Sequence, residues 1–315
     1  MNNDLIKNWL EKQSALVVDG AMATELEKRG VDTDNDLWSA MALVHDPDAV
    51  VAVHRSYFDA GANIAITDSY QANIPAFVKA GLTQEQSGKM IFDSVKLAQR
   101  ARSEYEQTLT DEVRQEKPLL IAGSVGPYGA YLADGSEYTG DYSLTQQEYQ
   151  DFHRARLNLL EGAGIDLFAF ETQPNFAEAK ALVNLLQNEF SGIPAWLSFS
   201  VTDQAKLCDG TPLTQAVEYF NQFPDIVAIG VNCTAMANIE ALIQVIAKAT
   251  DKPIIVYPNN GDTYDPVTKT WELNPNAKSF SELVPKWRAA GASLIGGCCR
   301  TTPADIQEIS ASFKA

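Results

Sequence analysis

Histidine, cysteine and positive charge are all scarce in this sequence. Its 315 residues include 3 histidines, 4 cysteines and 24 lysines and arginines, against 41 aspartates and glutamates. The net charge of −17 would repel nucleic-acid phosphates and anionic lipid surfaces, so we expect neither nucleic acid nor a membrane as a partner. Four cysteines are too few for a disulfide framework in a chain this long, and clustered thiols are more often ligands or nucleophiles.

Long apolar runs are missing as well. Residues 1–15 carry polar side chains throughout and lack the apolar core of a signal peptide. No later stretch reaches the roughly 18 consecutive apolar residues of a membrane span. We therefore expect a cytoplasmic protein. Hydrophobic residues at 45% and charged residues at 21% are ordinary for a compact globular fold.

Glycine-rich phosphate-binding motifs are the third absence. Neither a G-x-G-x-x-G after the first apolar run nor a Walker-type loop occurs, which argues against an open, doubly wound nucleotide-binding sheet. The chain has instead a succession of short apolar runs rich in valine, isoleucine, leucine and phenylalanine. These runs predict eight strands, at residues 16–20, 63–70, 119–126, 165–172, 195–201, 226–233, 253–259 and 292–299.

Segments with helical periodicity lie between these strands, for example residues 47–62, 145–164, 175–190, 237–250 and 279–292. Strands that are apolar on both faces and alternate with helices indicate a parallel sheet, and eight such units predict a closed (β/α)8 barrel, the TIM barrel. No linker divides the chain, so we expect a single domain over residues 1–315 with an N-terminal helix near 3–14. The long loops 127–144 and 258–277 should cover the barrel mouth.

Three of the four cysteines fall at the carboxyl ends of predicted strands. Cys233 ends the sixth strand in GVNC, and Cys298 and Cys299 end the eighth in GGCC. The active sites of such barrels lie at these strand ends. Because only one strand separates the sixth from the eighth, the three thiols should converge. Three thiolates with a vacant fourth position suit Zn²⁺ in tetrahedral geometry.

The adjacency of Cys298 and Cys299 complicates a shared metal, because neighbouring residues of a strand point to opposite faces. Gly296 and Gly297 supply the backbone freedom that would bring both thiols to one side. The alternatives are a vicinal disulfide or two inert buried thiols. Cys208, in the loop after the fifth strand, has no matching partner and is expected to be a spectator.

Several segments of the chain resemble the homocysteine S-methyltransferase family, nearly from end to end. The pattern of GVNC at 230–233 followed by GGCCRTTP at 296–303 matches that family. Further similarity lies in VVDGAMATELEKRG (17–30), ITDSYQAN (66–73), GSVGPYGAYLADGSEYTGDY (123–142), FETQPN (170–175) and YPNNGDTYD (257–265). The resemblance implies a (β/α)8 barrel that methylates homocysteine, and the loops look most like the branch that uses S-methylmethionine or S-adenosylmethionine.

The resemblance also implies functional residues. The zinc ligands would be Cys233, Cys298 and Cys299. Asp19 and Gly20 match the position that anchors the amino-acid substrate, and Glu171 matches its acidic partner, so Asp19 and Glu171 are the candidate catalytic residues. Thr67 falls in the segment near the substrate carboxylate, and Asn232 adjoins the first zinc ligand. Both join Asp19, Gly20 and Glu171 as candidate substrate-binding residues.

Some of these residues have simpler interpretations. Asp19 before Gly20 could cap the following helix, since aspartate is a favoured N-cap residue. Thr67 could be a strand or turn residue without a function. Glu171 is harder to explain structurally, because an unpaired buried carboxylate is costly. Asp68, next to Thr67, stands where the resembled family favours a small residue.

The implied reaction needs a thiolate. A free thiol has a pKa of about 8.5, and lowering it by about two units through zinc would be worth roughly 2.7 kcal/mol. We expect homocysteine to fill the fourth zinc position, with its ammonium near Asp19 and Glu171 and the methyl of the sulfonium donor in line with its sulfur. Betaine or a folate as donor, and a selenium acceptor, remain open. A sulfonium pocket could be lined by tyrosines of the long loops, Tyr128, Tyr131, Tyr138 and Tyr264.

Other chemistries have less support. The histidines lie in predicted helices or their leading loops, which argues against a histidine metal site or a Ser-His-Asp triad; they are His45, His54 and His153. A Schiff-base lyase would need a lysine at a strand end, and the predicted strand ends carry none. The remaining alternative is a zinc-binding or redox-sensing protein without catalysis, with Cys208 as a fourth ligand.

Overall fold

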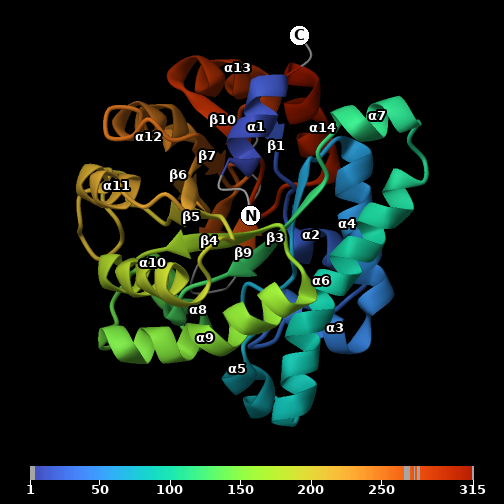
Figure 1. Ribbon diagram of the computed structural model, residues 1–315, viewed down its shortest axis with the longest axis vertical. Helices are drawn as coiled ribbons and strands as arrows, with labels where there is room; N and C mark the ends of the chain where they lie inside the picture. Colours follow the sequence, from blue (N-terminus) through green and yellow to red (C-terminus); the bar gives the residue numbers. More distant parts are fainter. Residues whose placement is uncertain (1–3, 266–269, 273, 275–276, 314–315) are drawn as a thin grey trace.

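Eight parallel strands form the centre of the molecule in the computed structural model, which describes residues 4–265, 270–272, 274 and 277–313 (Figure 1). They hydrogen-bond in the order β1-β10-β7-β6-β5-β4-β3-β2, and a bridge between Val18 and Ile64 brings β1 beside β2. The predicted (β/α)8 barrel is therefore confirmed. The strands are β1 (Leu16–Val17), β2 (Ile64–Ile66), β3 (Leu120–Val125), β4 (Leu167–Gln173), β5 (Ala195–Phe199), β6 (Ile226–Asn232), β7 (Ile254–Tyr257) and β10 (Ala292–Ile295).

Helices surround the barrel and connect its strands (Figure 1). They are α1 (Leu5–Lys12), α2 (Met22–Lys28), α3 (Ala42–His45), α4 (Pro47–Ala60), α5 (Ile74–Lys79), α6 (Gln84–Glu106), α7 (Asp111–Glu116), α8 (Tyr128–Leu132), α9 (Gln146–Ala163), α10 (Phe176–Glu189), α11 (Leu213–Asn221), α12 (Ile239–Ile246), α13 (Phe280–Ala290) and α14 (Pro303–Ser312). Two of them end at a glycine: α4 at Gly61 with φ 111° and α9 at Gly164 with φ 83°, left-handed conformations that glycine adopts without steric cost.

The strands bury both of their faces, as their uniformly apolar sequences require. In β1, Leu16 points into the barrel interior together with the adjoining Val18, whereas Val17 packs against the surrounding helices. Ile6 of α1 belongs to the interior cluster, so this helix closes the amino-terminal end of the barrel. The predicted N-terminal helix is thus present and covers the end that does not hold the strand carboxyl termini.

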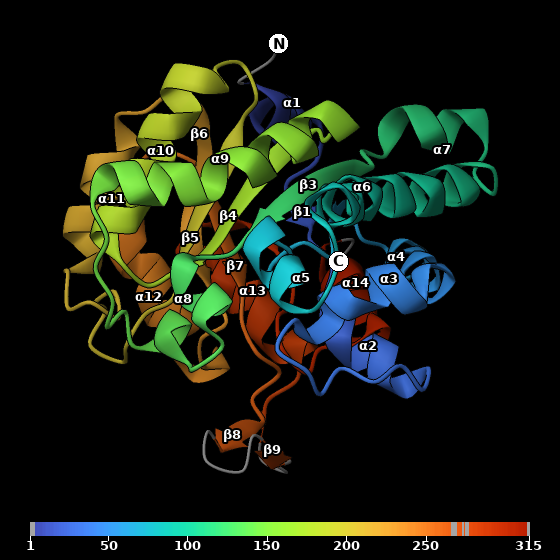
Figure 2. The ribbon, with the colours of Figure 1, turned by 90° about the horizontal axis from the view of Figure 1, so that it is seen from below.

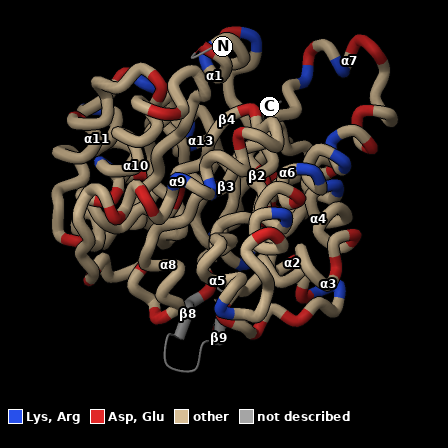
Figure 3. The backbone as a smooth tube through the Cα atoms, turned by 60° about the horizontal axis from the view of Figure 1, so that its bottom comes forward, with Lys and Arg blue, Asp and Glu red and all other residues tan. Residues whose placement is uncertain are grey.

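Charged residues lie mainly on the outer helices and loops, where α6 and α7 carry both signs (Figure 3). None of the helices in the described part of the chain combines the length and apolarity needed to cross a membrane.

The seam between β1 and β2 is short and is completed by a side chain. Asn63 N–H donates to the Val17 carbonyl at 2.7 Å, and Asp19 N–H donates to the Ile64 carbonyl at 3.0 Å. The Asn63 side chain accepts a hydrogen bond from Val17 N–H at 2.9 Å and donates to the Pro118 carbonyl at 3.2 Å. The amide of Asn63 thus satisfies backbone groups that the short strands leave unpaired.

The two long loops lie at the barrel end opposite α1 (Figure 2). The loop 127–144 contains α8 and the short helix η2 (Ser136–Tyr138). The loop 258–277 contains a projecting antiparallel pair, β8 (Thr263–Asp265) and β9 (Thr270–Glu272), which the sequence did not predict (Figure 2).

A buried polar network fixes the first of these loops. Glu178 of α10 accepts hydrogen bonds from Tyr128 N–H at 2.6 Å and from the Tyr142 hydroxyl at 2.5 Å. It also contacts Nε2 of His153 at 2.8 Å, while Arg156 lies 2.8 Å from Nδ1 of the same ring. Since arginine can only donate, Nδ1 is the acceptor and Nε2–H donates to Glu178. His153 thus serves to position the loop.

Candidate active site

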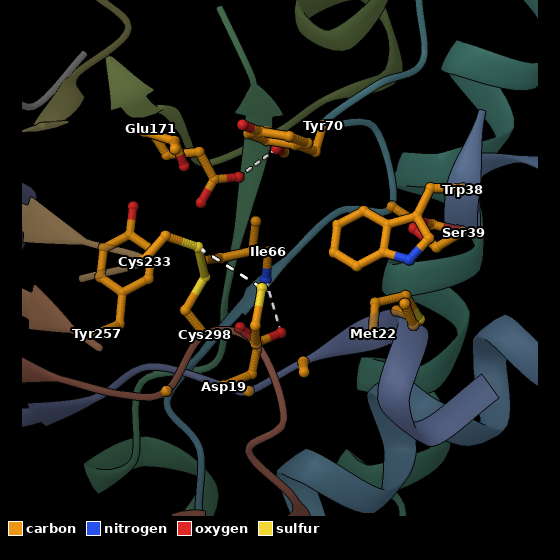
Figure 4. A pocket seen from close by; sticks show the side chains of 18 of the residues that line it. Asp19, Met22, Trp38, Ser39, Ile66, Tyr70, Glu171, Cys233, Tyr257 and Cys298 are labelled. Carbon is orange, nitrogen blue, oxygen red and sulfur yellow. Dashed lines mark hydrogen bonds between the residues drawn. A yellow bond between two sulfur atoms is a disulfide. The ribbon is translucent and has the colours of Figure 1, made fainter. Parts of the chain in front are cut away.

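A pocket opens at the carboxyl ends of the strands and collects most of the residues singled out in the sequence. Seven of these residues line the pocket: Asp19, Gly20, Thr67, Glu171, Cys233, Cys298 and Cys299. The cysteines and Tyr257 lie on one side, and Trp38, Ser39 and Met22 lie on the other (Figure 4). Residues from the first to the last strand therefore meet at one place, as the barrel topology predicts.

The three cysteine sulfurs lie within 4.8 Å of one another. Cys233 directly follows β6, and its N–H donates to the Tyr257 carbonyl at 3.1 Å. Cys298 N–H donates to the Pro258 carbonyl at 2.7 Å, and Cys299 N–H to Oδ1 of Asn259 at 3.1 Å. The segment after β7 thus holds both sides of the cluster together.

The backbone at the end of β10 leaves strand geometry, as the predicted cluster requires. The strand ends at Ile295, so the cysteines after it are free of the strand alternation. A Cβ atom on Gly296 would lie 2.7 Å from Cβ of Val18, and one on Gly297 would lie 2.4 Å from Oγ1 of Thr301. These two positions require glycine because the chain passes directly against its neighbours.

The cluster is oxidised in this structure. Cys233 and Cys298 form a disulfide, and the Cys299 sulfur lies 3.9 Å from that of Cys233 (Figure 4). The alternative of a vicinal disulfide between Cys298 and Cys299 is wrong, because Cys299 is free, and the three-cysteine metal site stays a prediction. Reduction by two electrons would restore three thiols at one site.

The chemistry of the donor set fits a metal ion. Three sulfur ligands within 4.8 Å suit a soft or borderline cation such as zinc. Burial raises the pKa of the Cys299 thiol to about 12, so without a cation the thiol stays neutral. A bound cation would stabilise the thiolate. Cys208 is not part of the cluster, since its sulfur lies 3.4 Å from the Ser200 carbonyl in the loop after β5.

Two buried carboxyl groups lie beside the sulfurs. Asp19 is 3% exposed and accepts a hydrogen bond from Ile66 N–H at 2.9 Å, while Glu171 of β4 is 6% exposed and accepts one from the Ser124 hydroxyl. Burial raises the pKa of Glu171 to about 7. Burial also raises the pKa of Asp19, and the nearby negative charge of Glu171 adds to that effect.

Neither carboxyl group has a cationic partner in the described part of the chain, and no lysine or arginine lines this pocket there. The alternative that Asp19 caps a helix is wrong, because α2 has Ala21 as its N-cap and no capping side chain. The absence of a lining lysine also leaves the Schiff-base alternative without its essential group. The arrangement is suited to binding a ligand cation.

Asn232 has a structural task. Its side chain accepts a hydrogen bond from Thr172 N–H at 2.8 Å and donates one to the Thr172 hydroxyl at 2.7 Å. Thr172 has φ 54°, a left-handed conformation that is unusual for a β-branched residue, and it lines the pocket. Asn232 is buried and is not among the lining residues, so its predicted contact with substrate stays a prediction.

Thr67 and Gly20 line the pocket as predicted, each with close contacts of its own. The Thr67 hydroxyl accepts a hydrogen bond from Ser124 N–H at 3.0 Å and shares another with the Ser69 hydroxyl at 2.7 Å. A Cβ atom on Gly20 would lie 2.8 Å from Cε1 of Tyr57, so this position allows little more than glycine.

Sequence reasoning noted Asp68 without giving it a role and missed other lining residues, namely Trp38, Ser39, Tyr70, Ser124 and Tyr257. Trp38 and Ser39 lie in the short helix η1 (Trp38–Met41). No pattern in the sequence predicts that this helix lies at the barrel mouth. Of the four tyrosines proposed for a sulfonium pocket, Tyr138 lines the pocket, whereas Tyr128 and Tyr131 pack on Phe152. The side chain of Tyr264 lies outside the described residues.

The fold and the site together define a TIM-barrel protein with a cluster of three cysteines, suited in its donor atoms to a metal ion, beside two buried carboxyl groups. Comparison with known proteins identifies its family. The model of the homocysteine S-methyltransferase family matches residues 16–313. The homocysteine S-methyltransferase of Escherichia coli (strain K12) is 48% identical over 310 residues, which is 98% of each chain. The chain belongs to the homocysteine S-methyltransferase family and is a methyltransferase.

Solved structures agree with this assignment. The metallated form of the Escherichia coli homocysteine methyltransferase MmuM matches with a TM-score of 0.87 and 46% sequence identity, covering 98% of this chain and 99% of that one. An oxidised form of MmuM matches with a TM-score of 0.87 and 46% identity, covering 99% of both chains.

Proposed function

We propose that this protein transfers a methyl group from S-methylmethionine or S-adenosylmethionine to the thiol of L-homocysteine, with zinc held by Cys233, Cys298 and Cys299. The proposal rests on one observation above all. Three cysteine sulfurs within 4.8 Å of one another share a pocket with two buried carboxyl groups that lack a cationic partner in the described residues. An amino acid with a thiol complements both features, because its sulfur suits a metal held by the cysteines and its ammonium group suits the two carboxyl groups. One barrel domain spanning residues 1–315 would carry out the reaction.

The carboxyl groups would bind and orient the acceptor. Asp19 is fixed by Ile66 N–H, and Glu171 is fixed by Ser124, so both are positioned before the substrate arrives. An ammonium group between them would donate charge-assisted hydrogen bonds to both carboxylates and would favour their ionised forms. Zinc bound by the three cysteines would stabilise the thiolate form of homocysteine at neutral pH.

The pocket would then exclude water from the transfer. The thiolate attacks the donor methyl carbon while the bond from that carbon to the sulfonium sulfur breaks, and the electron pair stays on that sulfur. Two opposite charges become two neutral thioethers, so a dry site favours the reaction more than water does. Methionine forms from homocysteine, and the donor becomes methionine or S-adenosylhomocysteine. No proton has to move once the thiolate is formed.

The decisive experiment measures methionine formation by reduced, zinc-loaded protein with homocysteine and each of three donors: S-methylmethionine, S-adenosylmethionine and betaine. The same assay is repeated after the metal is removed with a chelator and again after zinc is restored. We expect product with one of the sulfonium donors, loss of product without zinc, and recovery on reloading. Absence of product from every donor while zinc stays bound would favour a non-catalytic thiol protein.

A further inference from the structure

Asp68 carries an unsatisfied oxygen in the wall of the pocket. Its side chain is 4% exposed, and Oδ1 accepts a hydrogen bond from the Ser39 hydroxyl at 2.6 Å. Oδ2 is buried and has no hydrogen-bond partner within the described residues. Asp68 also lines the pocket. Buried polar atoms almost always have a partner, so an unpartnered carboxylate oxygen on a residue that lines a pocket indicates a missing ligand.

The missing ligand has to be a donor of hydrogen bonds and is best a cation. No lysine or arginine in the described ranges forms an ion pair with Asp68. Burial raises the pKa of Asp68 to about 6, against the opposing effect of the Ser39 hydrogen bond, so the group is mostly ionised at neutral pH. A buried anion with one neutral partner is costly, and an incoming cation would offset that cost.

The position of Asp68 separates it from the metal-binding cluster. Its hydrogen bond to Ser39 places it on the side of the pocket formed by Ser39 and Trp38, whereas Cys233 and Cys298 lie on the other side (Figure 4). Asp19 and Glu171 adjoin the sulfurs and are suited to an acceptor whose thiol binds there. The pocket therefore has carboxylates at two places.

Two amino acids have to bind at once in the proposed reaction, and each carries an α-ammonium group. We propose that Asp68 binds the α-ammonium group of the methyl donor and so sets the specificity for donors that are amino acids. This inference rests on the proposed function. Ser39 holds the carboxylate in place, and the indole of Trp38 closes the same end of the pocket, where an aromatic face adds to the attraction for a cation.

The test pairs a change in the enzyme with a change in the donor. Wild-type protein and Asp68→Asn are compared with S-methylmethionine and with dimethylsulfoniobutyrate, which is S-methylmethionine without its amino group. The control variant is Asp36→Asn, which removes one exposed carboxylate that pairs with Lys79 at the surface. If dimethylsulfoniobutyrate is too slow as a donor, its inhibition constant against S-methylmethionine replaces its rate.

For S-methylmethionine, we expect Asp68→Asn to lower kcat/KM about tenfold or more, because a hydrogen bond between charged groups is lost. The constant for dimethylsulfoniobutyrate and the KM for homocysteine should not change, and Asp36→Asn should behave as wild type. Equal losses with both donors, or a raised KM for homocysteine, would overturn the assignment of Asp68. Failure of the proposed function has a different signature, since the wild-type protein would then form no methionine from any donor.

Discussion

Ser124 of β3 donates a hydrogen bond to Glu171 of the neighbouring strand β4, and both residues line the pocket. A hydrogen bond to the ionised carboxylate favours that form, so Ser124 opposes the effect of burial on the pKa of Glu171. Together with Tyr257 and Arg156, which also lower this pKa, Ser124 therefore increases the fraction of Glu171 that is charged near neutral pH, where it would meet an ammonium group.

Ser124→Ala should raise the pKa of Glu171 further, from about 7. Because the ammonium of homocysteine needs the ionised carboxylate, the acid limb of kcat/KM for homocysteine should move to higher pH. Glu171→Gln has no carboxylate to protonate, so the decrease of kcat/KM at acid pH that comes from Glu171 should disappear. At neutral pH the same variant should lower kcat/KM about tenfold or more. The measurement is a pH series at saturating donor. An acid limb unchanged in Glu171→Gln would assign it to another group.

Substituting alanine for Cys233, Cys298 or Cys299 should abolish methionine formation and weaken zinc retention, because only two of the three sulfur ligands would remain to hold the metal. Zinc per protein molecule after gel filtration and the rate with S-methylmethionine are the two readouts. Cys208→Ala is the matched control and should keep both, since this thiol lies outside the cluster. Full activity of a zinc-free Cys298→Ala protein would be incompatible with the mechanism.

Gly230 on β6 has no room for a side chain, since an added Cβ would lie 1.6 Å from the Ile255 carbonyl oxygen on β7. Gly230→Ala should lower the free energy of unfolding by roughly 1–3 kcal/mol or more, because the strands would have to move apart. Gly88→Ala, inside α6, should raise it by roughly 0.5–1 kcal/mol, since its Cβ would only touch Leu159 at 3.7 Å. Urea unfolding of both variants measures the contrast, and equal stabilities would contradict it.

His54 is fully buried in α4, and neither ring nitrogen has a hydrogen-bond partner within the described ranges. Burial lowers its pKa to about 4, below the value of 6.5 for an unperturbed histidine. The unfolded chain therefore binds the proton first, and stability is lost as the pH falls from 6.5 towards 4. His54→Leu should remove this dependence.

The stability difference between wild type and His54→Leu should then change by about 1.4 kcal/mol per pH unit over that window, in favour of the variant at low pH. Unfolding free energies at several pH values provide the test. A difference that stays constant with pH would show that His54 is protonated in the folded protein.

The sequence predicted the barrel because its signals are local and repeated. Each strand is apolar on both faces, and helices such as α4 and α9 end at a glycine. The hydrophobic periodicity and the positions of these glycines therefore mark the same boundaries between elements. The pair β8 and β9 escaped prediction because each strand is only three residues long, too short to show an alternating pattern.

The site could be predicted from the sequence where residues with ligating or ionisable side chains lie at or near the carboxyl ends of strands. Cys233, Cys298, Asp19 and Glu171 all follow or end strands, so the topology alone brings them together. Asp68 and Trp38 could not be assigned in this way. A buried carboxylate is recognised only from what surrounds it, and the contact of Asp68 with Ser39 spans 29 residues.

The seam between β1 and β2 gives the pocket walls unequal rigidity. The two strands share a bridge at Val18 and Ile64 and rely on the Asn63 side chain, whereas β3 to β6 pair over longer registers. Asp19 and Thr67 directly follow the seam, while Glu171 lies in the well-paired region. An acceptor held between Asp19 and Glu171 would therefore connect this short seam to the strands with longer pairing and oppose local opening of the barrel there.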